Sequence, residues 1–275
     1  MSAARLAIAL LVVAAVGAVL WWHYQRPAAP PVSAVSTARE RAPQAPPPSA
    51  PTSPAIQYPV PPASPQRPRL PSLDDSDEYL KRALIDLLGR KAVLSFLHLD
   101  GFVRRFVATV NNLGTDSASA QLWPVNQTPG RLDTEVLEGD LVISAKNADR
   151  YAPFVRLAEG LDTERVVSVY ERLYPLFQAA YQDLGYPGKY FNDRVIEVID
   201  DLLATPTMSG AIKVRQIRVD GAVSAKGGLF LFEDPSLEAR SAGQKILLRM
   251  GPENALKLEA KLKDVRQRLT AHPAR

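Results

Sequence analysis

The stretch TERVVSVYERLYPLFQAAYQDL, residues 163–184, decides the fold class. Its apolar residues recur at steps of three and four, the period of a helix with one buried face. Asp162 before it is suited to an N-cap and Gly185 after it to a stop, so the spacing predicts a helix over the whole stretch. Pro175 predicts a kink near the middle, because proline lacks the N–H that the helix requires.

Four aromatic residues of this stretch share one helix face: Tyr170, Tyr174, Phe177 and Tyr181. Such a stripe is typical of helix packing, and we expect it to lie in the core. The alternative is that the four rings form a surface platform on which a sugar or a peptide stacks.

Helical spacing recurs on both sides of this stretch. Further helices are predicted at residues 79–88, 91–113, 193–204, 241–250 and 252–269. Asn192 is expected to cap the third of these, and Gly251-Pro252 to separate the last two. Four acidic residues within 74–78 precede the first helix, where capping is favoured over metal binding.

Short apolar runs complete the globular part. Leu141–Ile143 suggests a strand in a region that otherwise reads as loop, and residues 212–214 and 229–232 predict a small antiparallel sheet. Residues 72–271 are therefore predicted to form one domain that is mainly α with a small antiparallel β element, of the α+β class.

The segment LAIALLVVAAVGAVLWW, residues 6–22, predicts a single transmembrane helix within a membrane anchor at 1–26. As a helix it spans about 25 Å, slightly less than a hydrocarbon core of about 30 Å. A cleaved signal peptide is the alternative, but Trp21 and Trp22 stand where a small-x-small cleavage site would lie. Arg5 and Arg26 place nearly equal positive charge on the two sides of the span, so charge does not decide its orientation. We expect the C-terminal domain outside the cytoplasm because short N-terminal tails commonly stay inside.

Residues 27–71 hold 15 of the 24 prolines and a single acid, Glu40. Proline removes backbone donors, and the few apolar residues cannot offset the entropy of ordering, so we predict a disordered proline-rich linker. Fully extended, it would reach about 140 Å. It is either a spacer across an envelope compartment or a linker whose length hardly matters.

Several kinds of chemistry find no support in the sequence. The chain has no cysteine, and its three histidines are not spaced as metal ligands; His98 is expected to be packed rather than to act as a base. There is no P-loop, G-x-G-x-x-G or G-x-S-x-G motif. A net charge of +4, with acids and bases interspersed, gives little support to nucleic-acid binding. We expect no metal, no cofactor and no nucleic acid.

Two long motifs stand out, YFNDR at residues 190–194 and SAGQKILLRMGPEN at residues 241–254, with shorter ones at 73–77, 150–155 and 173–177. Together they resemble the domain of unknown function 3014 family over about residues 70–269. The resemblance implies a single-pass envelope protein of Gram-negative bacteria and no particular activity, ligand or catalytic residue. Where the family motif reads Phe-Ala-Asp-Pro, this chain has Glu233 in place of the alanine.

Polar residues inside the two long motifs form the candidate functional cluster, since apolar packing does not explain them: Tyr190, Asn192, Asp193, Arg194, Lys245, Arg249 and Asn254. We expect a non-enzymatic binding or scaffold domain, anchored in the bacterial inner membrane, facing the periplasm, and contacting an envelope protein or the cell-wall polymer. The alternative is a carboxylate-dependent hydrolase of a wall glycan or peptide that uses acids from Asp193, Glu197, Asp200, Asp201, Asp234 and Glu238. Asp193 could instead assist a helix N-terminus and pair with Arg194 or another arginine.

Overall fold

The structure, a computed structural model, describes residues 55–61, 69–219, 222–223 and 229–271. The chain divides into two compact units, 1–50 and 51–275, and every described residue belongs to the second. The predicted membrane span at 6–22 and most of the predicted linker lie outside the described residues. Among the residues that are described, no helix combines the length and the apolar character needed to cross a membrane.

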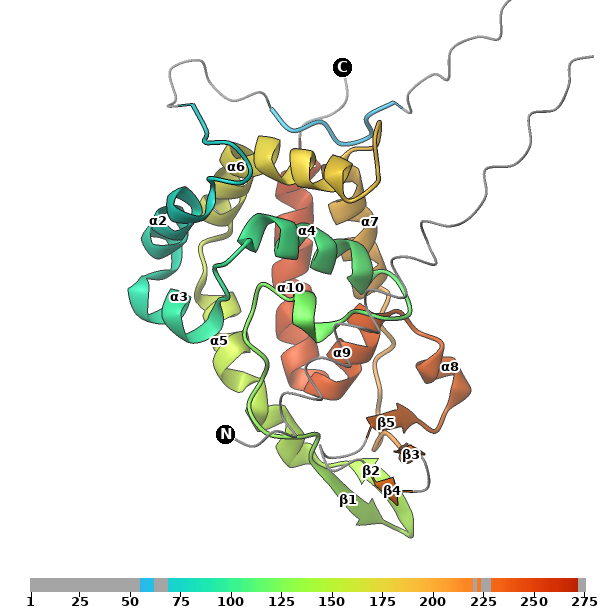
Figure 1. The fold of residues 1–275 in the computed structure, drawn as a ribbon. Coiled ribbons are helices and arrows are strands. Elements are labelled where there is room, and N and C mark those ends of the chain that lie inside the picture. Colours follow the sequence, from blue (N-terminus) through green and yellow to red (C-terminus); the bar gives the residue numbers. More distant parts are fainter. Residues whose placement is uncertain (1–54, 62–68, 220–221, 224–228, 272–275) are drawn as a thin grey trace, which may run out of the picture. The chain divides into compact units, whose positions relative to one another are not determined.

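The described part is mainly helical with short antiparallel strands, as predicted (Figure 1). Its α-helices are α2 (Asp77–Leu88), α3 (Arg90–Phe96), α4 (Phe102–Leu113), α5 (Ala152–Gly160), α6 (Thr163–Asp183), α7 (Phe191–Leu203), α8 (Pro235–Glu238), α9 (Ala242–Met250) and α10 (Pro252–Leu269). The 3-10 helices are η1 (Ala120–Leu122) and η2 (Ala145–Arg150), and the strands are β1 (Thr134–Leu137), β2 (Asp140–Ile143), β3 (Val214–Val219), β4 (Ala222–Val223) and β5 (Leu229–Phe232).

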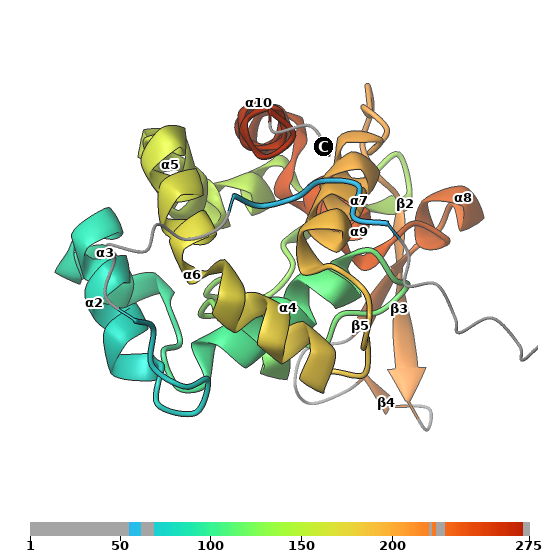
Figure 2. The same cartoon turned by 90° about the horizontal axis from the view of Figure 1, so that it is seen from above.

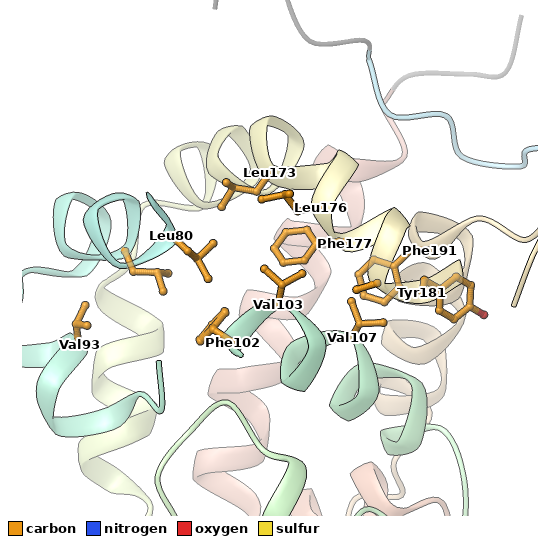
Figure 3. Close-up of a cluster of buried hydrophobic side chains, with 12 residues drawn as sticks. Leu80, Val93, Phe102, Val103, Val107, Leu173, Leu176, Phe177, Tyr181 and Phe191 are labelled. Carbon is orange, nitrogen blue, oxygen red and sulfur yellow. The ribbon is translucent and has the colours of Figure 1, made fainter. Parts of the chain in front are cut away.

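The aromatic face of α6 lies in the main core, which confirms the packing interpretation (Figure 3). Phe177 and Tyr181 are buried, and the ring of Tyr170 stacks on that of Phe177 with centroids 5.5 Å apart. Phe106 of α4 and Phe191 of α7 approach Phe177 at 5.0 and 6.1 Å between centroids. Offset and tilted ring pairs at these distances stabilise a core beyond the area that they bury.

Two details of the predicted helices are wrong. The helix expected over 91–113 is two helices, because Gly101 takes a left-handed φ of 60° and Leu97 pairs with Val125. His98 lies in this break and is exposed rather than packed. Its backbone N–H donates to the carbonyl of Pro124 at 2.8 Å. Asn192 does not cap α7, which begins at Phe191 with Tyr190 as N-cap.

The strands form two small antiparallel sheets. β1 and β2 make a hairpin whose two-residue turn, Glu138-Gly139, has φ values of 53° and 93°. β3 pairs with β4 and with β5, where Val214 lies opposite Phe232, as the apolar runs predict. A bridge between Val142 and Lys213 joins the hairpin to the second sheet.

α10 connects the two ends of this unit. Its first residues follow the turn at Gly251 and lie near the β-hairpin, whereas its last turn lies near residues 55–61 (Figures 1 and 2). Leu269, its last residue, belongs to the cluster against which Tyr58 packs. Its 18 residues correspond to about 27 Å of helix. Along the way it contacts α5, α6, α7 and α9, so the packing of α10 sets the distance between the two ends.

Candidate functional site

The predicted functional residues separate into two groups. Tyr190, Asn192, Asp193 and Arg194 lie at the start of α7, whereas Lys245, Arg249 and Asn254 lie on α9 and α10. Within the described part of the chain, no hydrogen bond joins one group to the other. The sequence motifs therefore mark two places rather than one cluster.

The α7 group holds residues 55–61, which we call the strap. Asn192 is fully buried; its Nδ2 donates to the Tyr58 carbonyl at 2.9 Å, and its Oδ1 accepts from the Tyr170 hydroxyl at 3.0 Å. Asp193 accepts from the backbone N–H of Tyr58 at 2.8 Å and of Gln57 at 3.2 Å. The strap lies within the predicted linker range, so this part of the range has a defined contact with the helical domain.

Arg194 faces away from the strap, towards α4. One guanidinium nitrogen donates to the carbonyl of Asn111 at 2.7 Å, and the other pairs with Glu197 at 2.8 Å. A Cβ on Gly114 would lie 2.9 Å from this guanidinium, so the glycine leaves the space that Arg194 occupies. The expected Asp193–Arg194 pair is not formed, since each side chain contacts a different element.

Arg249 and Lys245 of α9 are turned towards the second sheet. The Arg249 guanidinium lies 4.5 Å from the centroid of the Phe232 ring and donates to the Phe230 carbonyl at 3.3 Å. Burial lowers the pKa of Arg249. Lys245 pairs with Glu238 at 3.3 Å, and the carboxylate of Glu238 also accepts from the Phe232 N–H at 2.8 Å. Both cations thus fasten α9 to β5 and α8.

Two buried asparagines join η2 to the turn between α9 and α10. Asn254 donates to the carbonyls of Ala148 and Met250, both at 2.9 Å. Asn147, which is fully buried, donates to the Arg249 carbonyl at 2.6 Å and accepts from the Asp133 N–H at 3.1 Å. Because a buried amide requires its partners, these bonds fix the relative position of the two segments.

This junction forms one side of a cleft of about 670 Å³. Its other sides come from the β-hairpin, the loop at 205–212 and the first turns of α10. The apolar part of its lining is aliphatic and contains no aromatic side chain: Leu137, Val142, Ile143, Ala145, Ala148, Ala152, Pro206, Met208, Ala211, Ile212, Leu247, Leu248, Pro252, Ala255 and Leu256. Leu137 and Leu256 are 52% and 55% exposed, which makes them the accessible apolar contacts of the cleft. Arg249 and Asn254 line it as well, whereas the α7 group does not.

The carboxylates considered for hydrolysis each have a structural partner. Glu197 pairs with Arg194, Asp200 with Arg266, and Asp201 accepts from the Ser241 hydroxyl at 2.6 Å. Asp234 caps α8 through the N–H of Ser236, and Glu238 pairs with Lys245. In the described ranges, no three His, Asp or Glu residues are grouped to hold a metal ion. Asp77 and Glu78 lie in the first turn of α2, as predicted, although no side chain there caps the helix. Asp74 pairs with Arg104 of α4, and Asp77 also accepts from the N–H of Gly101, the N-cap of α4.

Sequence reasoning missed the cleft and, apart from Arg249 and Asn254, the residues that shape it. α5 is not predicted, although Pro153 in its first turn is a typical helix-start signal. Asn147 and the loop at 205–212 carry no periodic pattern, so no local signal marks them. Leu137 and Leu256 read as ordinary apolar residues of a strand and a helix, and their exposure depends on how the elements pack.

No curated protein and no solved structure gives a significant match to the chain. The family model described as "protein of unknown function (DUF3014)" matches residues 102–266, which is more than half of the 275 residues. The matched range includes Asn147, Asn192, Asn254 and every residue that lines the cleft, whereas the strap lies outside it. The chain therefore belongs to the DUF3014 family.

Proposed function

We propose that this protein is a membrane-anchored envelope protein whose helical domain binds a polypeptide segment of another envelope protein in the cleft beside α10. The observation that carries the proposal is the cleft itself. Its volume lies within the range of binding sites, about 300–1,000 Å³, and its apolar lining opens to solvent at Leu137 and Leu256.

The lining favours a polypeptide over the cell-wall glycan. Sugar rings are commonly held by stacking on aromatic faces, and the cleft has none. Aliphatic side chains such as Leu137, Met208 and Leu256 complement the aliphatic side chains of a peptide. The pairing of Asp193, Asp200 and Asp201 gives no support to hydrolysis, so we propose binding without turnover.

The anchor and the envelope location rest on the sequence. The apolar segment at 6–22 is followed by a proline-rich segment, which suits a domain that must reach a partner away from a membrane. An alkaline phosphatase fusion at the C-terminus of the full chain tests the orientation, because this enzyme becomes active only outside the cytoplasm. We expect activity, and an inactive fusion would place the domain in the cytoplasm.

Site-specific photo-cross-linking in the native membrane tests the binding role. A photoreactive residue at position 256 should give one discrete adduct with another protein. Position 94 on α3 is the matched control, since Leu94 is a leucine that is 62% exposed and does not line the cleft. The adduct at position 256 should disappear with Leu137→Asp. Identical adducts at both positions, or none at position 256, would contradict binding in the cleft.

A further inference from the structure

We infer that the polypeptide segment taken by the cleft is cationic as well as apolar. This inference rests on the proposed function and adds the chemical class of the partner. It starts from four carboxylates that line the cleft: Glu135 on β1, Asp149 on η2, and Glu253 and Glu259 on α10. Glu135, Asp149 and Glu253 are exposed, so a ligand can reach them.

The two cations that line the cleft have other partners. The Arg249 guanidinium stacks over Phe232 and donates to the carbonyls of Phe230 and Lys245. The ammonium of Lys257 lies 3.7 Å from a carboxylate oxygen of Glu159. Neither cation pairs with the four lining carboxylates.

Those four carboxylates have no ion-pair partner within 4 Å among the residues that the structure describes. The cleft is thus negative at its rim on a chain whose net charge is +4. A groove lined by one sign of charge, with low-dielectric walls, concentrates ligands of the opposite sign. Complementary charge also fixes orientation and excludes like-charged partners.

The acids alternate with the exposed leucines on two walls. On the hairpin, Glu135 and Leu137 share one strand face. On α10, Glu253, Leu256 and Glu259 follow at steps of three, so they share one helix face. A segment in which aliphatic residues alternate with Lys or Arg would match both patterns, with its apolar side chains on the leucines and its cations on the carboxylates.

The test uses the full chain in nanodiscs of phosphatidylcholine and three fluorescein-labelled peptides of equal length. The peptides share the same leucine positions and carry Lys, Ser or Glu between them. Anisotropy titrations at 50 and 300 mM NaCl, with empty nanodiscs subtracted, give the dissociation constants. We expect the Lys peptide to bind at least tenfold more tightly than the Ser peptide, and to lose several-fold in affinity at the higher salt concentration.

Variants locate the effect. Glu135→Gln combined with Glu253→Gln should weaken the Lys peptide about tenfold and leave the Ser peptide unchanged. Asp86→Asn combined with Asp116→Asn is the matched control, since both are exposed acids outside the cleft, and should change neither constant. Equal affinities for the Lys and Ser peptides, or equal losses in both double variants, would overturn the inference.

The outcomes separate this inference from the proposed function. If the Ser peptide binds as tightly as the Lys peptide and Leu256→Asp abolishes both, the cleft binds peptides but has no preference for cations. If none of the three peptides binds, or if Leu256→Asp leaves binding intact, the cleft is not a peptide site and both proposals fail.

Discussion

The carboxylate of Asp193 accepts a hydrogen bond of 2.8 Å from the backbone N–H of Tyr58, a residue 135 positions away in the sequence. The preceding residue, Asn192, donates to the carbonyl of the same Tyr58. Two neighbouring residues of the YFNDR motif thus hold both main-chain groups of one strap residue. Tyr58 is in turn half-buried and packs against the cluster of Val167, Ile196 and Leu269. The motif therefore has a structural role that requires an amide followed by a carboxylate.

Asp193→Ala should release the strap and lower the free energy of unfolding by about 1.5–3 kcal/mol, the range for hydrogen bonds to a charged group. Urea denaturation measures the loss, and hydrogen exchange at the Tyr58 amide should become much faster. Asp86→Ala, which removes an exposed carboxylate of α2, is the control and should leave both quantities unchanged. Unaltered exchange at Tyr58 in Asp193→Ala would show that the carboxylate does not hold the strap.

Asn192→Ala should cost about 1–3 kcal/mol, because it leaves the Tyr170 hydroxyl and the Tyr58 carbonyl without their partner. Combining it with Tyr170→Phe should give a coupling energy of about 0.5–3 kcal/mol, since the second change removes the orphaned hydroxyl. Urea denaturation of the two single variants and the double variant completes the cycle. Strictly additive losses would argue against the bond between these side chains.

Gly243→Ala should destabilise the fold by about 1–3 kcal/mol, the usual cost of overpacking. A Cβ there would overlap the side chain of Leu202 and lie 3.1 Å from the Leu113 carbonyl, so α9 would have to move away from α4 and α7. Gly160→Ala is the control, because a Cβ at that helix end meets open space. Because it removes the overlapping side chain, Leu202→Ala should cost less in a Gly243→Ala background than alone. Thermal unfolding of Gly243→Ala, Gly160→Ala, Leu202→Ala and the Gly243→Ala, Leu202→Ala double variant measures this, and equal costs in both backgrounds would contradict the overlap.

Alkaline conditions should weaken the fold between pH 10 and 12. Burial raises the pKa of Tyr174 to about 12, above its ordinary value of 10.0, so its contribution to stability is complete below pH 10 and is lost as the pH rises towards 12. Burial also raises the pKa of Tyr170. Tyr174→Phe should therefore reduce the slope of unfolding free energy against pH in this range, and an unchanged slope would contradict the assignment. The tyrosinate absorbance of the folded protein should also rise at a higher pH than that of the unfolded chain.

The sequence predicts helices well where their signals are local. Asp162 and Gly185 bound α6, and Gly251-Pro252 separates α9 from α10, because caps and stops depend only on neighbouring residues. The break at 97–101 was missed although Asp100-Gly101 is a local turn signal, because the apolar pattern continues through Leu97 and Leu99. It depends on the pairing of Leu97 with Val125, a contact that periodicity does not contain.

The candidate site is predictable only in part, because its contacts also join residues that lie far apart in the sequence. Polar residues inside long motifs drew attention to Asn192 and Arg249, and both make specific contacts. The partners of Asn192 lie 22 and 134 positions away in the sequence. Local sequence signals therefore predict a helix cap at Asn192 and not its contact with the strap. The cleft is built from five segments, and only their packing brings Leu137 and Leu256 to the same opening.

The position of the strap gives the domain a direction. Residues 55–61 lie at the α6–α7 end of the domain (Figure 1), where Tyr58 packs against the cluster that contains Leu269. The cleft is lined by the first turns of α10, at the other end of that helix. A force applied through the segment that precedes residue 55 would therefore reach the domain at the strap, at the end of α10 that is remote from the cleft. Pulling on that segment would load the two hydrogen bonds of Asp193 before the contacts that line the cleft, so tension on the proposed anchor would reach the strap before the proposed binding site.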